Sequence, residues 1–338
     1  MYRLAWPAQY LAAQGHDIGI CYFGQRGILE IHSRDGVHVD GISMPPGVDV
    51  VVVQRVSNRL FVEAIKALRS MGIAVVMDMD DDLGRIHKSH VAYKLYNPKV
   101  RFGDPPPLHH HEHVQAAADA ATMVTSTTPA LQAQYARHGR GAILDNYVCG
   151  SDLDIPHDDS DTIGWAGDTK TRADDWQVVG DALRKMINEG NTFFVVGAEG
   201  NLGEQLKLPF EPSYTGYVHV TKFTTAMSRF GIGMAPLFPS RFNEAKSRLK
   251  PIQMAAVGMP WVGSPSYAYR RFHEESGTGI LASNPQEWYQ ALKRLVNEPN
   301  LRMEMGAQGR EYMKTQTIEA NAWRWWEAWT EALKLERG

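Results

Sequence analysis

The sequence has few cysteines and no marked surplus of either charge. Its 2 cysteines, Cys21 and Cys149, in 338 residues are too few for a disulfide framework, which indicates a reducing cytoplasm. The sequence contains 35 Lys and Arg residues and 38 Asp and Glu residues. The resulting net charge of −3 argues against a protein that coats nucleic acid non-specifically. A local basic site is compatible with this balance.

Long apolar runs and low-complexity tracts are missing as well. The first fifteen residues are interrupted by Arg3, Pro7, Gln9 and Gln14, and no later apolar run approaches the roughly 18 residues of a membrane helix. We therefore expect neither a signal peptide nor a membrane span. The chain of 338 residues is longer than the roughly 250–300 residues at which one core stops growing, which predicts two domains.

Short β-rich runs alternate with helical patterns, which is typical of parallel sheets with crossover helices. In the first half we expect helices at 5–14, 60–71 and 109–121 and strands at 17–22, 48–53, 73–78 and 123–126. The acidic stretch 151–161 has no periodicity and is predicted to be a linker. After it we expect strands at 162–166, 193–196, 232–235 and 261–263 and helices at 176–188, 223–230, 246–257, 287–297 and 301–315. The fold class is α/β, with two doubly wound halves that face a cleft.

A cluster of cations stands before one of these helices. Within ten positions the sequence RFNEAKSRLK carries Arg241, Lys246, Arg248 and Lys250. A helix that begins at Lys246 would point its first free amides, including that of Ser247, toward a ligand. Because a helix N-terminus favours acidic side chains, cations there predict a bound anion such as pyrophosphate. The alternative is a solvated basic face that is balanced by Glu244.

The histidine-rich run HHHEH at 109–113 raises the possibility of a metal site. His109 and His113 are four residues apart on a predicted helix, but zincin chemistry needs a second His where this chain has Gln115. We therefore predict exposed histidines and no metal.

Tryptophans are concentrated near the C-terminus. Trp323, Trp326 and Trp329 are spaced three residues apart, and Trp325 and Leu333 widen the stripe. Such a stripe usually packs against a core rather than binding a ligand. We therefore expect the apolar face of this last helix to pack against a core.

Five stretches, in order along the chain, resemble GT-B glycosyltransferases of the glycogen-synthase-like group. FNEAKSRLK at 242–250, continuing through AAVGMP to residue 264, resembles their donor-binding segment, in particular that of bacterial and phage-encoded members with an aKSxLKxxE helix. IGWAG at 163–167 resembles the phosphate loop of their second domain, and YTGYV at 214–218 their base-binding turn. VTST at 124–127 and Asn146 resemble the end of their first domain.

This resemblance implies a GT-B fold: a Rossmann-like acceptor domain at 1–155, a Rossmann-like nucleotide-sugar domain at 156–316, and a C-terminal helix at 317–338 that returns to the first domain. It implies a hexosyltransferase that uses a UDP- or GDP-linked sugar, needs neither metal nor cofactor, and retains configuration. The acceptor hydroxyl is left open. Modified bases of phage DNA, proteins, lipids and small molecules are all candidate acceptors. If the protein is phage-encoded, the expected location is the host cytoplasm. The oligomeric state is unknown.

The resemblance also assigns the donor site. Lys246 and Lys250 would bind the diphosphate, with Lys170 or Arg172 reaching the same phosphates, a role that preorganised charge performs well. The other donor-binding residues that it implies are Gly167, Tyr217, Val218, Ser247 and Gln253.

Two departures from the family pattern are visible. Gln253 occupies the position where this group has a Glu that accepts from the ribose hydroxyls, and its amide oxygen accepts without a charge. In addition, the first strand of the first domain, with its glycine-rich turn, is missing before the helix at 5–14, so the natural start is expected upstream. Donor identity is therefore less well defined than the fold.

Carboxylates gather after the strand at 73–78, in the sequence MDMDDDLGR. Asp80 and Asp81 are the catalytic candidates, because side chains at a strand's carboxyl end can orient an acceptor hydroxyl or remove its proton. If the leaving phosphate takes the proton, the two would only position the acceptor. A solvated acidic turn with Asp82 starting a cap, or a metal cluster of oxygens, are the alternatives.

Two other functional classes share these features. A non-hydrolysing sugar-nucleotide epimerase has the same fold and would alter the sugar without any acceptor. A non-catalytic nucleotide-binding module is favoured by Gln253 and by the missing strand. Donor hydrolysis without acceptor would separate these classes from a transferase.

Overall fold

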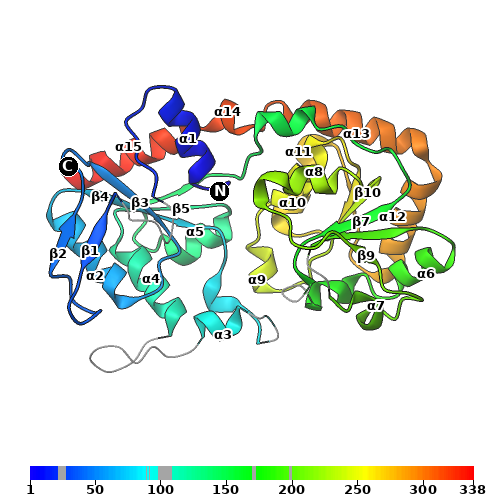
Figure 1. Ribbon diagram of the computed structural model, residues 1–338, viewed down its shortest axis with the longest axis horizontal. Coiled ribbons are helices and arrows are strands. Elements are labelled where there is room, and N and C mark those ends of the chain that lie inside the picture. The colour runs from blue at the N-terminus through cyan, green and yellow to red at the C-terminus, as the bar shows by residue number, and fades with distance from the viewer. Residues whose placement is uncertain (22–27, 89, 91, 98–108, 170–172, 198–199) are drawn as a thin grey trace. The chain divides into compact units, whose positions relative to one another are not determined.

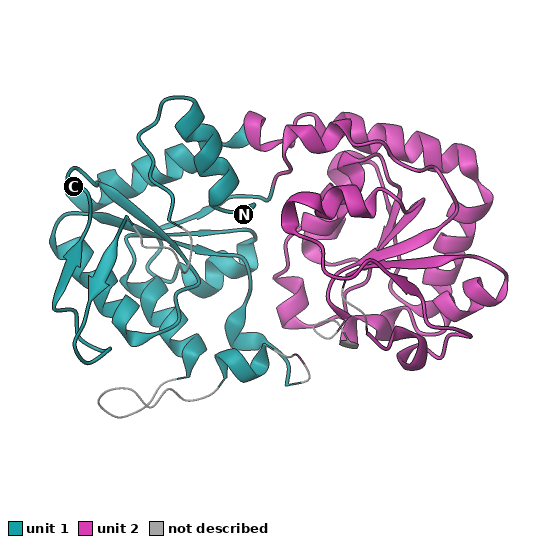
Figure 2. Cartoon of the chain, viewed as in Figure 1, with its two compact units in different colours: residues 1–88, 92–146, 321–338 teal, residues 89–91, 147–320 magenta. Residues whose placement is uncertain are grey.

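The computed structural model describes residues 1–21, 28–88, 90, 92–97, 109–169, 173–197 and 200–338. The chain forms two compact units, shown in two colours in Figure 2. Unit 1 contains residues 1–88, 92–146 and 321–338, and unit 2 contains residues 89–91 and 147–320. The sequence placed the corresponding boundaries after residues 155 and 316. Among the described helices, none is long and apolar enough to cross a membrane.

Unit 1 is built on a parallel four-stranded sheet. The strands follow one another in space in the order β3 (Val50–Gln54), β4 (Ala74–Met79), β5 (Met123–Ser126) and β6 (Gly141–Ile143). The connecting segments contain α2 (Arg59–Ser70), η1 (Leu83–Arg85), α3 (Tyr93–Tyr96), α4 (His110–Ala120) and α5 (Pro129–Tyr135). Every residue of β4 is buried, because helices cover both faces of the strand, as Figure 1 shows for α2, α4 and α15.

The N-terminal part of unit 1 differs from the expected pattern. Helix α1 (Ala5–Ala13) is present, but residues 17–21 form no strand. Gly19 has no side chain to pack in a strand and instead lies against Ile28. Two strands that were not predicted, β1 (Glu30–His32) and β2 (Gly41–Ser43), form an antiparallel pair.

The last helix, α15 (Trp323–Arg337), belongs to unit 1 and packs on β3 and β4. Its buried residues are Trp325, Ala328, Trp329 and Ala332. The predicted stripe was right for Trp325 and Trp329 but wrong for Trp323 and Trp326, which are 46% and 38% exposed. The reason is geometric, because spacings of three and four residues return to the same helix face, whereas a repeated spacing of three drifts away from it.

Unit 2 contains a parallel six-stranded sheet with the order β12-β11-β10-β7-β8-β9. The strands are β7 (Ile163–Ala166), β8 (Phe193–Val196), β9 (Ser213–Tyr214), β10 (Ile232–Ala235), β11 (Trp261–Gly263) and β12 (Ile280–Leu281). The chain runs outward from β7 to β9 and then returns to β10 beside β7. This reversal is the topological switch point of a doubly wound fold, where open α/β sheets bind ligands.

The helices of unit 2 pack around this sheet and bury Trp165, Trp261 and Trp288. They are η2 (Gly150–Asp154), η4 (Ala173–Val178), α6 (Ala182–Asn188), α7 (Leu202–Gln205), η5 (Val220–Lys222), α8 (Phe223–Met227), α9 (Arg241–Glu244), α10 (Leu249–Ala256), α11 (Tyr267–Ser276), α12 (Pro285–Asn297), α13 (Pro299–Met313) and α14 (Ile318–Asn321).

Two predicted helices differ from the structure in their extent. The pattern at 176–188 is split between η4 and α6, and Gly180 between them has a left-handed φ of +55°. The pattern at 246–257 corresponds to the shorter α10, and the separate short helix α9 precedes it. Because Pro251 has no backbone N–H and its ring clashes with the preceding turn, it is tolerated in the first turn of a helix but not in its interior. Helix α10 therefore begins at Leu249, and Lys246 and Ser247 precede it.

Candidate functional site

The switch point of unit 2 is marked by a glycine that follows β7. Gly167 has a φ of +154°, and its N–H donates to the carbonyl of Val196 at 2.9 Å. A Cβ added at Gly167 would lie 2.9 Å from the ring of Trp165 and 3.1 Å from Nζ of Lys250. No larger residue fits there without displacing these groups.

A second glycine, which sequence reasoning missed, follows β8. A Cβ on Gly197 would lie 2.0 Å from the carbonyl oxygen of Gly167, so the loops after β7 and β8 touch. The N–H of Gly197 donates to Oγ1 of Thr215 at 3.1 Å. The ends of β7, β8 and β9 thus meet through main-chain groups. The V-V-G sequence at the end of β8, which is similar to the W-A-G after β7, was the available signal.

Lys250 joins this group from the first turn of α10. Its ammonium donates to the carbonyl of Ala166, the last residue of β7, and lies 4.5 Å from the centroid of the Trp165 ring. The side chain is half-buried. The structure therefore brings two of the predicted donor residues, Gly167 and Lys250, together at the switch point.

The other predicted cations do not form one cluster with Lys250. Arg248 is 3% exposed and forms an ion pair with Glu275 at 2.5 Å. Burial acts to raise the pKa of Glu275, but hydrogen bonds from Arg271 and Tyr312 and the charge of Arg248 lower it to about 2. Arg248 therefore connects α10 to α11 as a structural residue. Nζ of Lys246 lies 4.2 Å from the centroid of the Phe242 ring, a cation–π contact.

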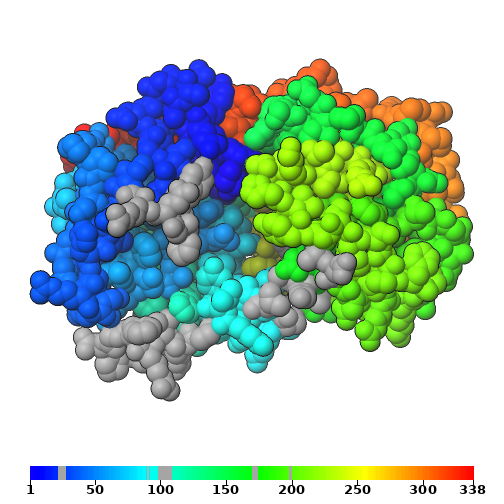
Figure 3. All heavy atoms as spheres, in the orientation of Figure 1, coloured from blue at the N-terminus to red at the C-terminus, as the bar shows by residue number. Residues whose placement is uncertain are grey.

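The remaining donor candidates occupy varied environments. Gln253 is 3% exposed within α10, whereas Tyr217, which follows a Gly216 with a left-handed φ of +77°, is 85% exposed. Val218 is half-buried against the core. The segment from β9 to α8 forms part of the yellow-green surface of unit 2 in Figure 3. Lys170 and Arg172 lie outside the described residues.

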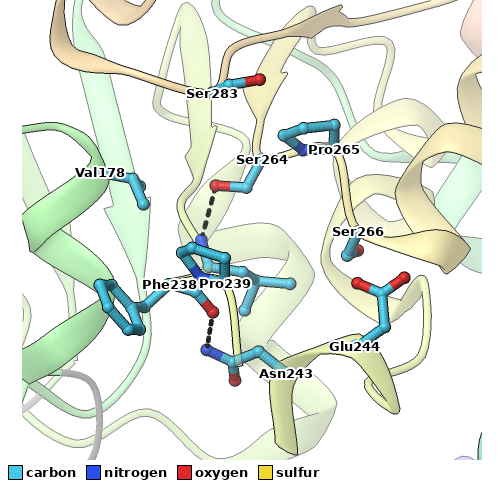
Figure 4. Close-up of a pocket in the computed structure, with 10 residues that line it drawn as sticks. Val178, Phe238, Pro239, Asn243, Glu244, Ser264, Pro265, Ser266 and Ser283 are labelled. Carbon is cyan, nitrogen blue, oxygen red and sulfur yellow. Dashed lines mark hydrogen bonds between the residues drawn. The ribbon is translucent and has the colours of Figure 1, made fainter. Parts of the chain in front are cut away.

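A pocket of ≈140 Å³ lies at the carboxyl ends of β10, β11 and β12 (Figure 4). Two of its lining residues are held by the buried Asp175, which accepts hydrogen bonds from the N–H of Phe238 at 2.9 Å and from the amide of Asn243 at 2.6 Å. Oγ of Ser264 accepts from the N–H of Leu237 at 2.9 Å. These contacts order the loop between β10 and α9, and no sequence motif indicated them.

In unit 1, the carboxyl end of β4 begins with a fully paired carboxylate. Asp78 is buried, accepts from Arg3 at 2.5 Å and from Thr125 at 2.7 Å, and also accepts from Gln54 at 3.1 Å. Its oxygens are therefore occupied by side chains from the segment before α1 and from the strands on either side. Asp78 is a structural residue of the sheet.

The catalytic candidates Asp80 and Asp81 follow it and share one arginine. Nε of Arg55 lies 3.3 Å from Oδ1 of Asp80, and Nη1 lies 3.8 Å from Oδ2 of Asp81. Burial, with the negative charge of Asp81 as a second cause, raises the pKa of Asp80 to about 6, although Arg55 opposes the rise. A carboxyl group with this pKa can exchange a proton near neutral pH.

Asp82 was one candidate for a helix cap in this turn, and the structure does not support that role. It precedes η1, but its side chain makes no capping hydrogen bond there. Burial raises the pKa of Asp82, and the charge of Arg85, 3.5 Å away, opposes this. The hydroxyl of Tyr135 accepts from the N–H of Leu83 at 3.0 Å and so closes the turn. Within the described ranges no group of His, Cys, Asp and Glu side chains is arranged to hold a metal ion.

The histidines at 109–113 are less exposed than the sequence predicted. His113 is 6% exposed, and Nδ1 of His110 lies 2.9 Å from the carbonyl oxygen of Ser57. The rings of His109 and His111 stack with centroids 5.3 Å apart. Burial lowers the pKa of His111 and of His113, which favours neutral rings at neutral pH.

Comparison with known proteins supports the fold. No protein-family model and no curated protein sequence matches this chain. Among solved structures, HepE of Anabaena in complex with UDP-glucose is 12% identical, with a TM-score of 0.59 over 84% of this chain and 79% of HepE. Sucrose-phosphate synthase of Thermosynechococcus elongatus is 14% identical, with a TM-score of 0.58 over 85% of this chain and 74% of that chain.

TarM of S. aureus, in complex with fondaparinux, alpha-GlcNAc-glycerol and UDP, is 15% identical, with a TM-score of 0.55 over 76% of this chain. Because the match covers 51% of TarM, this chain spans about half the length of that protein. At these identities the likeness concerns the fold. The chain has the two-unit α/β architecture of the GT-B fold, as its sequence motifs predicted.

Proposed function

We propose that this protein is a glycosyltransferase that transfers a sugar from a UDP-linked donor to an acceptor hydroxyl. The observation that carries the proposal is the meeting of Gly167 and Lys250 at the switch point of a GT-B unit. Structures of the same fold, HepE and TarM, contain UDP. A glycine-lined strand end with an ammonium beside it suits a diphosphate, because without a Cβ the main chain can approach the ligand closely.

The chemistry assigned to this edge is stabilisation of the leaving diphosphate. Negative charge on the diphosphate increases as the bond to the sugar breaks, and the ammonium of Lys250 is held beside it before reaction by Ala166 and Trp165. A charge that is already oriented costs little reorganisation in the transition state. Lys246, Ser247 and Gln253 belong to the same proposal as contacts to phosphate and ribose.

The acceptor is assigned to unit 1. Asp80 and Asp81 lie at the carboxyl ends of its strands, where a hydroxyl can donate to a carboxylate. Retention of configuration, independence of metal and cofactor, and a modified base of phage DNA as acceptor rest on the sequence resemblance alone and stay predictions. The cytoplasmic location, which the small number of cysteines indicates, also stays a prediction.

Nucleotide binding and donor breakdown test the proposal. UDP, GDP, UDP-glucose and UDP-GlcNAc are added separately, and the melting temperature is recorded, because a ligand that binds the native state raises it. Release of UDP from UDP-sugars is then measured without acceptor. Slow release with an unaltered sugar supports a transferase, an epimerised sugar indicates the epimerase, and binding without any release indicates a non-catalytic module. Absence of binding by all four nucleotides contradicts the proposal.

A further inference from the structure

Arg55, the residue after β3, has an unusual backbone. Its φ is +49°, and among the described non-glycine residues only Lys207, with a φ of +53°, shares this left-handed conformation. The conformation is disfavoured for side chains with a Cβ and persists where the surrounding structure requires it. Its N–H donates to the carbonyl of Asp78 at 3.3 Å, so the main chain is held against the end of β4.

This backbone directs the guanidinium at the acidic turn. Residues Gln54 and Asp78 are register partners in β3 and β4, so Arg55 emerges where Asp80 and Asp81 follow. The two ion-pair distances, 3.3 Å to Asp80 and 3.8 Å to Asp81, place Asp80 nearer. An extended residue at position 55 would continue the strand and point its side chain elsewhere.

Asp80 also differs from Asp78 in its hydrogen bonds. Its Oδ1 is buried and has no hydrogen-bond partner, since the contact with Arg55 lacks hydrogen-bond geometry. Asp78, by contrast, accepts from three side chains. A buried carboxylate oxygen without a hydrogen bond is costly, which indicates that a donor is supplied by a ligand.

We propose that Arg55 is a positioning residue that orients the Asp80 carboxylate, rather than Asp81, to accept a hydrogen bond from the acceptor hydroxyl. This inference rests on the proposed transferase function for the identity of the ligand. Arg55 acts through Asp80 by supplying a positive charge and a fixed orientation. The strain at position 55 is then part of the site, because relaxing it would move the guanidinium.

The charges around Asp80 determine what removal of Arg55 does. The groups that act on it, besides Arg55, are Asp81, Asp78, Arg3 and the α-amino group of Met1. Arg55 lowers the pKa of Asp80, whereas burial and the two carboxylates raise it. Without Arg55 the pKa of Asp80 therefore rises above about 6, and the carboxylate becomes partly protonated at neutral pH.

The first test measures this pKa directly. The carboxyl carbon signal of Asp80, assigned with Asp80→Asn, is titrated by NMR in the wild type, Arg55→Gln and Arg55→Lys. We expect the pKa to rise by about one unit in Arg55→Gln, because an opposite charge within about 4–6 Å shifts a carboxyl by one unit or more. Arg55→Lys keeps the positive charge, so the pKa of Asp80 in this variant should stay close to the wild-type value. An unchanged pKa in Arg55→Gln overturns the proposal.

The second test compares transfer with binding. In Arg55→Gln the acid limb of the pH profile of transfer should move to higher pH by the shift that NMR measures, because Asp80 must be ionised to accept the hydroxyl proton. Affinity for UDP should stay within about twofold, since it depends on unit 2. A uniform loss at every pH, in step with a lower melting temperature, would show a merely structural role and overturn the proposal.

Glycine substitutions examine the strain. Arg55→Gly relieves the left-handed strain and removes the charge, so its melting temperature should equal or exceed that of Arg55→Gln while transfer stays low. Lys207→Gly is the matched control: it relieves the same strain at an exposed position and should leave transfer unchanged. Wild-type transfer by Arg55→Gly contradicts the assignment.

Failure of the proposed function would be recognised separately. If the wild type releases no UDP and transfers no sugar, the transferase proposal fails, but the NMR titration still decides whether Arg55 controls Asp80. If transfer is present and the pKa of Asp80 does not respond to Arg55, only the positioning role fails.

Discussion

The two units have the same parallel-sheet architecture, but the side chains at the carboxyl edges of their sheets differ in charge and size. In unit 2 the edge is formed by Gly167 and Gly197, and the ammonium of Lys250 donates to the carbonyl of Ala166. In unit 1 the edge is crowded with carboxylates, and Arg55 faces Asp80 and Asp81. Parallel strands deliver residues to the same kind of edge in both units, so the side chains that follow each strand decide whether an anion or a hydroxyl can bind there.

The two edges also differ in how they are ordered. In unit 2 the loops after β7 and β8 can touch because glycine has no side chain: a Cβ at Gly197 would overlap the main chain of Gly167. In unit 1 order depends on ion pairs around Asp80, which keep charged groups partly out of water at a cost. We therefore expect the unit 2 edge to be sensitive to side-chain size and the unit 1 edge to be sensitive to charge and pH.

The largest effect is expected from Asp80→Asn. The amide cannot accept a proton, so transfer should fall by roughly 10²–10⁴ if Asp80 serves the acceptor, while UDP affinity stays within about twofold. Asp81→Asn is the matched control and should lose less, since its carboxylate is the more distant partner of Arg55. Donor affinity, transfer rate and melting temperature are measured on both variants. Weakened donor binding with intact folding would contradict the division of roles between the edges.

Lys250→Ala is expected to weaken UDP binding by on the order of 1.5–3 kcal/mol, because a hydrogen bond with a charged donor is lost. Lys246→Ala should weaken it less, since Lys246 precedes α10 and contacts Phe242 rather than the end of β7. Calorimetric titration with UDP measures both. Unchanged affinity in both variants would remove the anion site from unit 2.

Gly197→Ala tests whether the unit 2 edge is sensitive to side-chain size. The added Cβ would lie 2.0 Å from the carbonyl oxygen of Gly167, so we expect a loss of about 1–3 kcal/mol in stability and weaker UDP binding. Gly190→Ala is the control, because Gly190 also has a positive φ, +95°, but a Cβ added there would have no atom within 4 Å. Chemical denaturation measures both. An equal loss would mean that φ alone, and not close approach, requires glycine at 197.

The smallest effect is expected at Gln253. Gln253→Leu should lower donor affinity by about 0.5–1.5 kcal/mol if the amide accepts from a ribose hydroxyl, whereas Gln253→Glu should preserve or raise it. Because Gln253 is 3% exposed, thermal stability is recorded beside affinity. Equal donor affinity in the wild type and both variants would place Gln253 outside the site.

The buried strands were predictable, since continuous apolar runs bounded by turns define them. The strands at 123–126, 193–196, 232–235 and 261–263 were placed at the residues where they occur. The start of α10 was predictable from Pro251, because proline is tolerated only in the first turn of a helix. The prediction instead followed the helical pattern on both sides of Pro251 and began the helix too early. Local pattern thus located most strands of the two parallel sheets but missed β6, β9 and β12. The glycine after β7 was indicated by the family resemblance.

The polar networks were not predictable in the same way. Arg55 and Asp80 follow neighbouring strands, so their contact depends on the register of β3 and β4. Asp175 reaches Asn243 across an even longer separation in sequence. Such pairs have no local period, and the left-handed backbone that directs Arg55 leaves no trace in composition.

The return of α15 to unit 1 has a consequence for synthesis on the ribosome. Unit 2 is made almost entirely of the continuous segment 147–320, whereas unit 1 needs residues 321–338 to cover β3 and β4. Trp325, whose indole N–H donates to the carbonyl of Arg3 at 2.7 Å, joins residues 322 positions apart. The N-terminal sheet is therefore translated first but completed last, and until α15 emerges its apolar face is open to chaperones and to aggregation.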